Sequence, residues 1–74
     1  MGHAMAKVFI EQEEDGWRAK RNKITVGRSG TQTDLGEEMH DRFPGDVIFG
    51  ERVRRGDNDL PKPDKWRVLH QPKE

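Results

Sequence analysis

The chain has 74 residues, of which 30% are hydrophobic and 38% charged, and its formal net charge is zero. A chain of this length allows one domain, and its balanced charge argues against a protein that coats nucleic acid over its whole surface. It contains no cysteine, so no disulfide forms, which is compatible with a reducing cytoplasm. No apolar run approaches the ~20 residues that span a bilayer, and no signal peptide is recognisable. The sequence therefore predicts a soluble, cytoplasmic protein that does not enter a membrane.

The first four residues, Met1-Gly2-His3-Ala4, are typical of a vector remnant in front of a start at Met5. Residues 5–70 are expected to form a single domain, and residues 71–74 a frayed tail. The apolar residues fall into patterned runs, which indicates a folded chain in spite of the high charge. A domain of this size is expected to be stable by roughly 3–5 kcal/mol.

Two strands are predicted at the start of the domain. Residues 7–12 contain Val8-Phe9-Ile10, a run of β-branched and aromatic side chains. Glu14-Asp15-Gly16 is a turn signal, because glycine accepts positive φ and aspartate favours turns. Trp17 and Ala19 then alternate with basic residues, which places both toward the core of a second strand. The two strands are expected to form a β-hairpin.

The next segment leaves two readings open. Ile24 and Val26 resume the alternation after Asn22, so residues 23–27 are either a third strand or a continuation of the second. Gly27-Arg28-Ser29-Gly30 breaks the pattern and is expected to open a loop.

A helix is predicted next, with Thr33 or Asp34 as its N-cap and Asp34 with Glu37 at the spacing of a capping box. Its length of about three turns requires docking on a sheet for stability. Pro44-Gly45 is expected to end it. Spacing of i, i+4 and i+8 places three apolar residues on its buried face: Leu35, Met39 and Phe43.

Two further strands are predicted after the helix, with a loop of turn residues at positions 56–63 between them. Residues 46–54 are expected to place Val47, Phe49 and Val53 on one face. Residues 65–70 are expected to place Trp66, Val68 and His70 on one face.

These elements predict an α+β fold, a small two-layer domain in which one helix packs on one face of an antiparallel sheet. The order is strand, strand, a possible third strand, helix, strand, strand. The predicted core consists of Val8, Ile10, Trp17, Ala19, Ile24, Val26, Leu35, Met39, Phe43, Val47, Phe49, Trp66 and Val68.

Basic residues form two local clusters that predict a polyanion-binding surface. Side chains of one parity share a face of a strand, so these residues could gather on the outer face of the sheet and meet a phosphate backbone. The alternative is a solvated face that deters edge-to-edge aggregation. The candidate residues are Arg18, Lys20, Lys23, Arg28, Arg52, Arg54 and Arg55.

Other constellations give weaker signals. Glu37 and His40 have the Glu-x-x-His spacing of carboxylate-bridged metal sites, but the chain has no second copy. Asp57-Asn58-Asp59 lacks the ligand spacing of a calcium loop and is interpreted as a turn. The segment 27–31 precedes the helix, so it is either a simple loop or a phosphate contact at a helix N-terminus.

Nucleophilic catalysis has little support, because the chain has no cysteine and Ser29 is its only serine. No cofactor, metal or catalytic residue is predicted. The sequence favours a small non-enzymatic binding module, with nucleic acid as the partner of the basic strand face. The alternative is a protein-interaction or assembly module that pairs through an exposed strand edge.

The order of signals also resembles a family of small uncharacterised bacterial proteins. The matching segments lie between positions 7 and 56 and are Asp15-Gly16-Trp17-Arg18-Ala19-Lys20, Thr31-Gln32-Thr33 and Val47-Ile48-Phe49-Gly50. The resemblance implies a bacterial protein with this order of strands and helix, and it implies no function.

Overall fold

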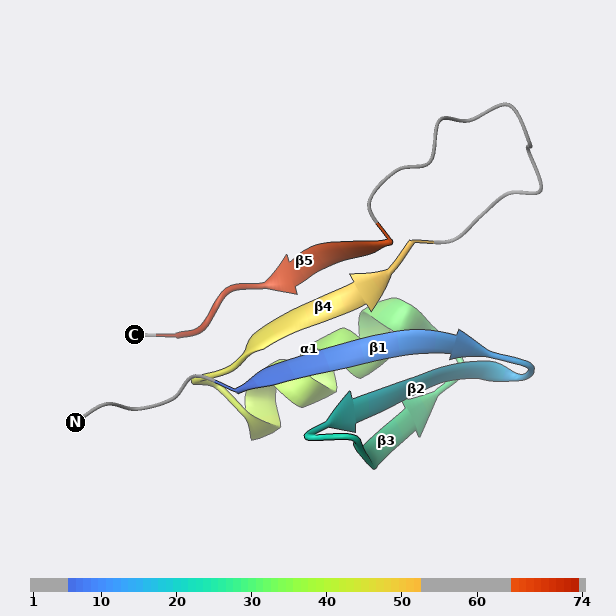
Figure 1. The fold of residues 1–74 in the computed structure, drawn as a ribbon, viewed down its shortest axis with the longest axis horizontal. Helices are drawn as coiled ribbons and strands as arrows, with labels where there is room; N and C mark the ends of the chain where they lie inside the picture. The colour runs from blue at the N-terminus through green and yellow to red at the C-terminus, as the bar shows by residue number, and fades with distance from the viewer. Residues whose placement is uncertain (1–5, 53–64, 74) are drawn as a thin grey trace.

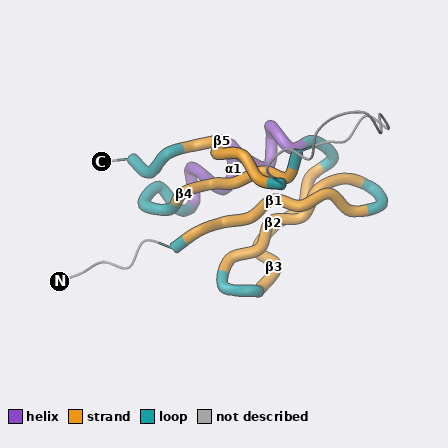
Figure 2. Tube along the Cα trace, turned by 45° about the horizontal axis from the view of Figure 1, so that its top comes forward, coloured by secondary structure: helices purple, strands orange, loops and turns teal. Residues whose placement is uncertain are grey.

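The computed structural model describes residues 6–52 and 65–73, which form one helix and one five-stranded sheet (Figure 1). The elements are β1 (Lys7–Glu13), β2 (Gly16–Arg21), β3 (Ile24–Ser29), α1 (Gln32–Arg42), β4 (Val47–Glu51) and β5 (Trp66–His70). The α+β class and the order of the elements along the chain are confirmed, and the segment that allowed two readings, residues 23–27, lies in a separate third strand from Ile24 onward. The helix packs on one face of the sheet, as Figure 2 shows.

The sheet is mixed, with the strand order β3-β2-β1-β4-β5. β1 pairs with β2 and β2 with β3 in antiparallel fashion, as do β4 and β5, whereas β1 and β4 are parallel. The prediction of an entirely antiparallel sheet was therefore wrong. Three strands in up-and-down order are followed by a helix that returns across the sheet, so β4 runs in the direction of β1. β4 pairs with β1 along the edge that β2 does not cover.

The turn between β2 and β3 separates the two strands. Asn22 and Lys23 both have positive φ, of 54° and 68°, which is the geometry of a two-residue hairpin turn that matches strand twist. Ile24 follows directly on an edge strand and is 65% exposed, so its predicted place in the core was wrong. An edge position beside a turn has too few neighbours to bury a large side chain.

The predicted loop at residues 27–30 was also wrong in part, because β3 continues to Ser29. Gly27 lies under the helix, where an added Cβ would stand 3.0 Å from Cε of Met39 and 3.3 Å from Cδ1 of Leu35. This glycine therefore marks a close approach of helix and sheet.

The core lies between the sheet and α1. Its buried hydrophobic side chains are Val8, Ile10, Trp17, Ala19, Leu35, Met39 and Ile48. Val26, Phe43 and Leu69 are partly buried against them. The predicted helix face and the burial of Trp17, at 9% exposure, are thus confirmed.

The apolar residues of β4 and β5 were assigned to the wrong side. Ile48 and Gly50 are buried under the helix, whereas Val47 and Phe49 are half-buried on the opposite face. In β5, Trp66 is half-buried and Val68 is 45% exposed. Both strands carry apolar residues on both faces, so alternation alone could not decide which face meets the helix. The predicted position of Val53 lies outside the described residues.

The helix starts earlier than predicted. Thr31 is its N-cap, in extended conformation, and its side-chain oxygen accepts a hydrogen bond of 3.2 Å from the backbone N–H of Asp34. Thr31 and Asp34 are three residues apart, which is the spacing that was predicted for Asp34 and Glu37. The expected stop is confirmed, since the last helical residue is Arg42 and Phe43 is the C-cap.

Gln32 joins the start of the helix to β4 and β5. Its side-chain amide donates to the carbonyl of Glu51 at 2.8 Å, and its amide oxygen accepts from Arg67 at 2.8 Å. Gly50 makes room for this side chain, because an added Cβ would lie 2.6 Å from Nε2 of Gln32. Gln32 is buried and fully engaged, and it holds the edge strand β5 to the helix.

The chain after β5 contacts the loop that follows the helix. The backbone N–H of Lys73 donates to the carbonyl of Pro44 at 2.7 Å, and its ammonium lies 3.9 Å from Asp41. These contacts hold the described part of the predicted tail, residues 71–73, against the domain.

Candidate functional site

The face of the sheet opposite the helix has no covering layer in the described part of the chain, and we call it the open face (Figures 1 and 2). Three aromatic side chains from three adjacent strands meet at its centre. Phe9 stacks on Phe49 with ring centroids 5.2 Å apart, and Trp66 meets Phe9 edge-on at 5.1 Å. All three are half-buried. They form a continuous aromatic surface on the open face. The prediction that Phe49 and Trp66 lie in the core was therefore wrong.

A chain of alternating charges crosses β2, β1 and β3 on the same face. Glu11 lies 3.2 Å from Lys20 and 4.0 Å from Arg18. Glu13 accepts from Arg18 at 2.8 Å and lies 3.2 Å from Arg28 through its other oxygen. Arg18 and Arg28 stand directly opposite each other, so Glu13 separates two like charges that would otherwise repel.

The structure places part of the predicted polyanion surface together. Arg18, Lys20 and Arg28 share the open face, but each is paired with Glu11 or Glu13. Lys23 lies in the β2–β3 turn, at one end of the face. The acidic run therefore lies among the predicted basic residues, and its carboxylates compensate much of their charge.

The second basic cluster does not adjoin the first. Arg52 directly follows β4, and β1 separates β4 from β2 in the sheet. The neighbouring arrangement of the two arginine clusters that we expected is thus absent for this residue. Arg54 and Arg55 lie outside the described residues.

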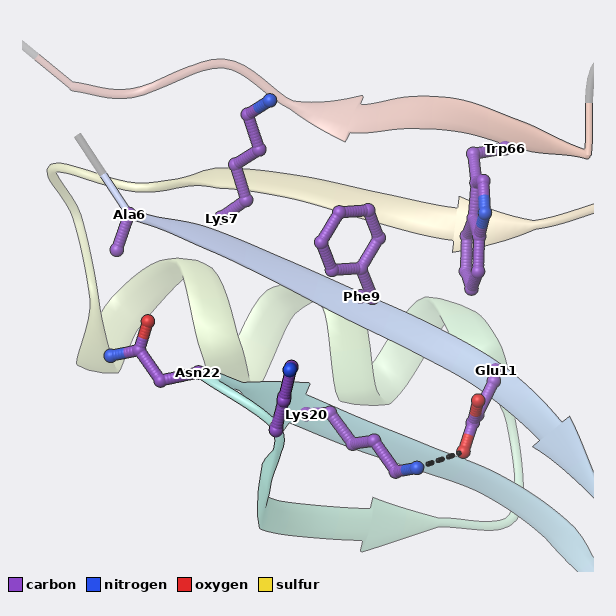
Figure 3. A pocket seen from close by; sticks show the side chains of 8 residues that line it. Ala6, Lys7, Phe9, Glu11, Lys20, Asn22 and Trp66 are labelled. Carbon is purple, nitrogen blue, oxygen red and sulfur yellow. Dashed lines mark ion pairs between the residues drawn. The ribbon is translucent and has the colours of Figure 1, made fainter.

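A shallow hollow of about 570 Å³ opens on the face at the start of β1. We call it the lysine hollow, and Figure 3 shows the side chains around it. Its aromatic lining comes from Phe9 and Trp66, and its other lining residues are Ala6, Lys7, Glu11, Lys20, Asn22 and Lys23. Among the residues described, no carboxylate lies within 4.0 Å of the ammonium of Lys7 or Lys23.

The sequence analysis placed neither Lys7 nor Phe9 in the candidate site, and it assigned Trp66 to the core. Lys7 stands alone in the sequence, outside both basic clusters. Phe9 was placed only within the first strand, in neither the core nor the candidate site, because that strand is apolar on both faces. The signal that could have found the two aromatic residues is the excess of apolar strand positions over what one short helix covers.

A second hollow, of about 520 Å³, lies at the opposite end of β1 and is lined by Glu13, Glu14, Asp15, Arg28 and Ser29. We call it the acidic hollow. Lys7 and Glu13 are the end residues of β1, so the two hollows open toward opposite ends of this strand.

The helix side carries two polar pairs. The rings of His40 and His70 stack with centroids 4.4 Å apart and an interplanar angle of 10°. Nδ1 of His40 is buried without a hydrogen-bond partner in the described chain. Burial, His70 and Lys73 lower the pKa of His40 below its ordinary value, because each disfavours the charged form. A β-bulge between Ile48 and Phe49 displaces His70, which explains why it does not share a face with Trp66 as predicted.

The second pair is Arg21 with Asp46. Nε of Arg21 donates to the buried carboxylate of Asp46 at 2.6 Å, and this hydrogen bond raises the pKa of Arg21. The guanidinium also lies over the ring of Phe43, 4.6 Å from its centroid. The contacts of Arg21 connect the end of β2 to the loop before β4. We therefore assign this pair a structural role.

The described residues contain no group of three or more His, Asp or Glu side chains that could hold a metal ion. Glu37 and His40 therefore have no further ligand there. No helix of residues 6–52 and 65–73 is long and apolar enough to cross a membrane. Compared with protein-family models, curated proteins and solved structures, the chain gave no match.

Proposed function

We propose that the protein is a non-enzymatic binding module that contacts single-stranded nucleic acid through the open face of its sheet. The observation that carries the proposal is the contiguous aromatic surface of Phe9, Phe49 and Trp66 on a sheet face that no other element of residues 6–52 and 65–73 covers. Aromatic side chains on an open sheet are a common platform for unstacked bases, since every base has a π-face.

The charges beside the aromatic surface support this partner. Lys7, Lys20 and Lys23 lie at one end of it, where they can meet a phosphate backbone. Because Glu11 and Glu13 compensate the arginines at the other end, the contact is expected to be local. Affinity should then lie near 10⁻⁴ to 10⁻⁶ M at physiological salt, as for other nonspecific electrostatic complexes.

The test is a titration of labelled protein with short single strands and duplexes of DNA and RNA at about 50 mM salt, where electrostatic binding is strong. Single strands are expected to shift resonances of Phe9, Phe49 and Trp66. The logarithm of the affinity should fall with that of the salt concentration at a slope of about −0.7 for each phosphate contact. If no open-face resonance moves with any nucleic acid, the proposal is wrong.

A matched pair of variants isolates the aromatic contribution. Trp66→Leu removes the indole but leaves an apolar side chain, and it is expected to weaken single-strand binding about ten-fold, since base stacking contributes ~1–3 kcal/mol. Val68→Ala changes the same strand and face without removing a ring. Equal losses in the two variants would argue against stacking.

The exposed apolar residues on the outer strands favour a second candidate, assembly through a strand edge. Ile24 on β3 and Val68 on β5 are the exposed large hydrophobic residues of the described chain, and these two strands are the outermost strands of the described sheet. Sedimentation at increasing protein concentration would reveal such assembly. Strand pairing should persist when salt is raised, whereas a phosphate-driven complex weakens steeply.

A further inference from the structure

We propose that the lysine hollow is a subsite for one nucleotide unit, with the base against Phe9 and Trp66 and the phosphate among the lysines. This inference rests on the proposed function and specifies which part of a nucleic acid the lysine hollow binds. The volume of about 570 Å³ lies within the ~300–1,000 Å³ of small-molecule sites. Figure 3 shows the hollow on the side of the sheet away from the helix.

The aromatic lining has a free surface for a base. Phe49 stacks on one side of the Phe9 ring at 5.2 Å, and Phe49 does not line the hollow. Phe9 and Trp66, which meets it edge-on, line the hollow beside Lys20, the direct partner of Phe9 across β1 and β2. A base that stacks there must be unpaired, so the site discriminates single strands from duplexes.

The charges of the hollow match one phosphate group. Its ionised side chains are Lys7, Lys20, Lys23 and Glu11, which leave two net positive charges when three cations are set against one carboxylate. A phosphomonoester carries about −1.5 to −2 charges at pH 7. Glu11 lies 3.2 Å from Lys20, so this pair is internally compensated and Lys7 and Lys23 supply the remaining positive charge of the hollow.

The backbone at Lys23 is a separate observation that supports the site. Its φ of 68° lies in the left-handed region, where glycine is favoured at this position of a two-residue hairpin turn. A lysine there is disfavoured by the fold. Backbone strain of this kind clusters at active sites and ligand-binding sites, and here the strained residue lines the hollow.

The experiment follows the indole N–H resonance of Trp66 and the amides of Lys20 and Lys23 during titration with three probes. Adenosine 5′-monophosphate carries base and phosphate, adenosine lacks the phosphate, and ribose 5-phosphate lacks the base. The mononucleotide is expected to shift all three residues and to bind at least ten-fold more tightly than either fragment. A mononucleotide that binds no better than its fragments overturns the subsite.

Two variants with the same charge change locate the phosphate. Lys23→Gln acts at the lysine hollow, and Arg28→Gln acts at the other end of the same face, on a side chain that is 62% exposed. Lys23→Gln is expected to weaken mononucleotide binding at least three-fold and Arg28→Gln to leave it unchanged. Equal losses of affinity in the two variants would mean that the ligand responds only to the overall electrostatic potential of the face, and the subsite would be wrong.

A single-stranded octanucleotide distinguishes this inference from the function on which it rests. If the octanucleotide shifts the open face while the mononucleotide does not, the subsite is wrong and the proposed function stands. If neither shifts it, both are wrong.

Discussion

The two ends of the open face have opposite charge although they are built from the same strand pair. The lysine hollow combines Lys7, Lys20 and Lys23 with one carboxylate, whereas the acidic hollow combines Glu13, Glu14 and Asp15 with one cation. Only the lysine hollow is lined by aromatic rings. A chain with zero formal net charge thus presents a charge gradient along one face, which net charge alone does not reveal.

The first prediction tests whether both ends depend on the layer behind them. Trp17→Ala is expected to cost about 3–5 kcal/mol, because Trp17 is 9% exposed in the core. That is comparable to the ~3–5 kcal/mol available to a domain of this size, so both hollows should be lost together. Urea unfolding monitored by circular dichroism provides the measurement.

Trp66→Ala is the matched control for this prediction, because it removes the same side chain from the open face. It should cost clearly less, since Trp66 is only half-buried. A cooperatively folded Trp17→Ala protein with little loss of stability would contradict the two-layer core.

The second prediction perturbs the acidic end alone. Gly16 has φ of 150°, and an added Cβ would stand 2.5 Å from the carbonyl oxygen of Ser29. Gly16→Ala is therefore expected to cost about 1–3 kcal/mol, measured as a lower Tm. Gly45→Ala is the control, because its Cβ would meet no atom within 4 Å. Similar Tm values for the two variants would show that the β1–β2 turn tolerates a side chain.

The third prediction concerns the lysine end. Lys23→Gly removes about 1 kcal/mol of left-handed strain, partly offset by the greater freedom of glycine in the unfolded chain. We expect a gain in stability of about 0.5 kcal/mol together with weaker mononucleotide binding. These opposite changes are what a residue kept for binding should show. A drop in Tm would mean that the lysine is favourable to the fold.

The fourth prediction is a pH effect behind the lysine end, where His70 pairs with Ile48 in the sheet. The pKa of His40 is lowered in the folded protein, so the unfolded chain takes up a proton first as the pH falls. The contribution of the neutral His40 side chain to stability is fully present above about pH 6.5, the ordinary histidine pKa. It is lost as the pH falls from there toward the lowered pKa.

Thermal unfolding between pH 7.5 and 5 measures this effect. His40 faces His70, Lys73 and Asp41, and His40→Phe keeps a ring against His70 while removing the titration. The decline in Tm toward pH 5 should be smaller in His40→Phe than in the unchanged protein. An identical decline would assign the pH dependence to other groups.

The sequence was informative where one physical rule acted alone. Trp17 and Ala19 alternate with charged residues, so their burial could be predicted, and the spacing of Leu35 and Met39 identified the helix face correctly. The sequence was misleading where a local pattern competed with tertiary packing. The residue Gly27 was interpreted as a break but permits close helix packing, and such packing is a tertiary property that no local pattern contains.

The candidate site was less accessible from the sequence than the fold. Arg18, Lys20 and Arg28 were chosen by charge, and their parity did place them on one face. Their partners Glu11 and Glu13 could be assigned only once the register of β1 against β2 was known. Trp66 reaches Phe9 through the order of β1, β4 and β5, and strand order depends on long-range pairing.

The parallel pairing of β1 with β4 has a consequence for synthesis. Ile10 and its partner Gly50 are 40 positions apart, so β1 completes its hairpin with β2 long before β4 emerges. At about 5–20 residues per second, translation leaves the second edge of β1 without its strand for roughly 2–8 s. An unpaired apolar edge is a template for association with other chains, and Val8, Phe9 and Ile10 make this one apolar. Slow translation between positions 20 and 47 should therefore favour aggregation of nascent chains.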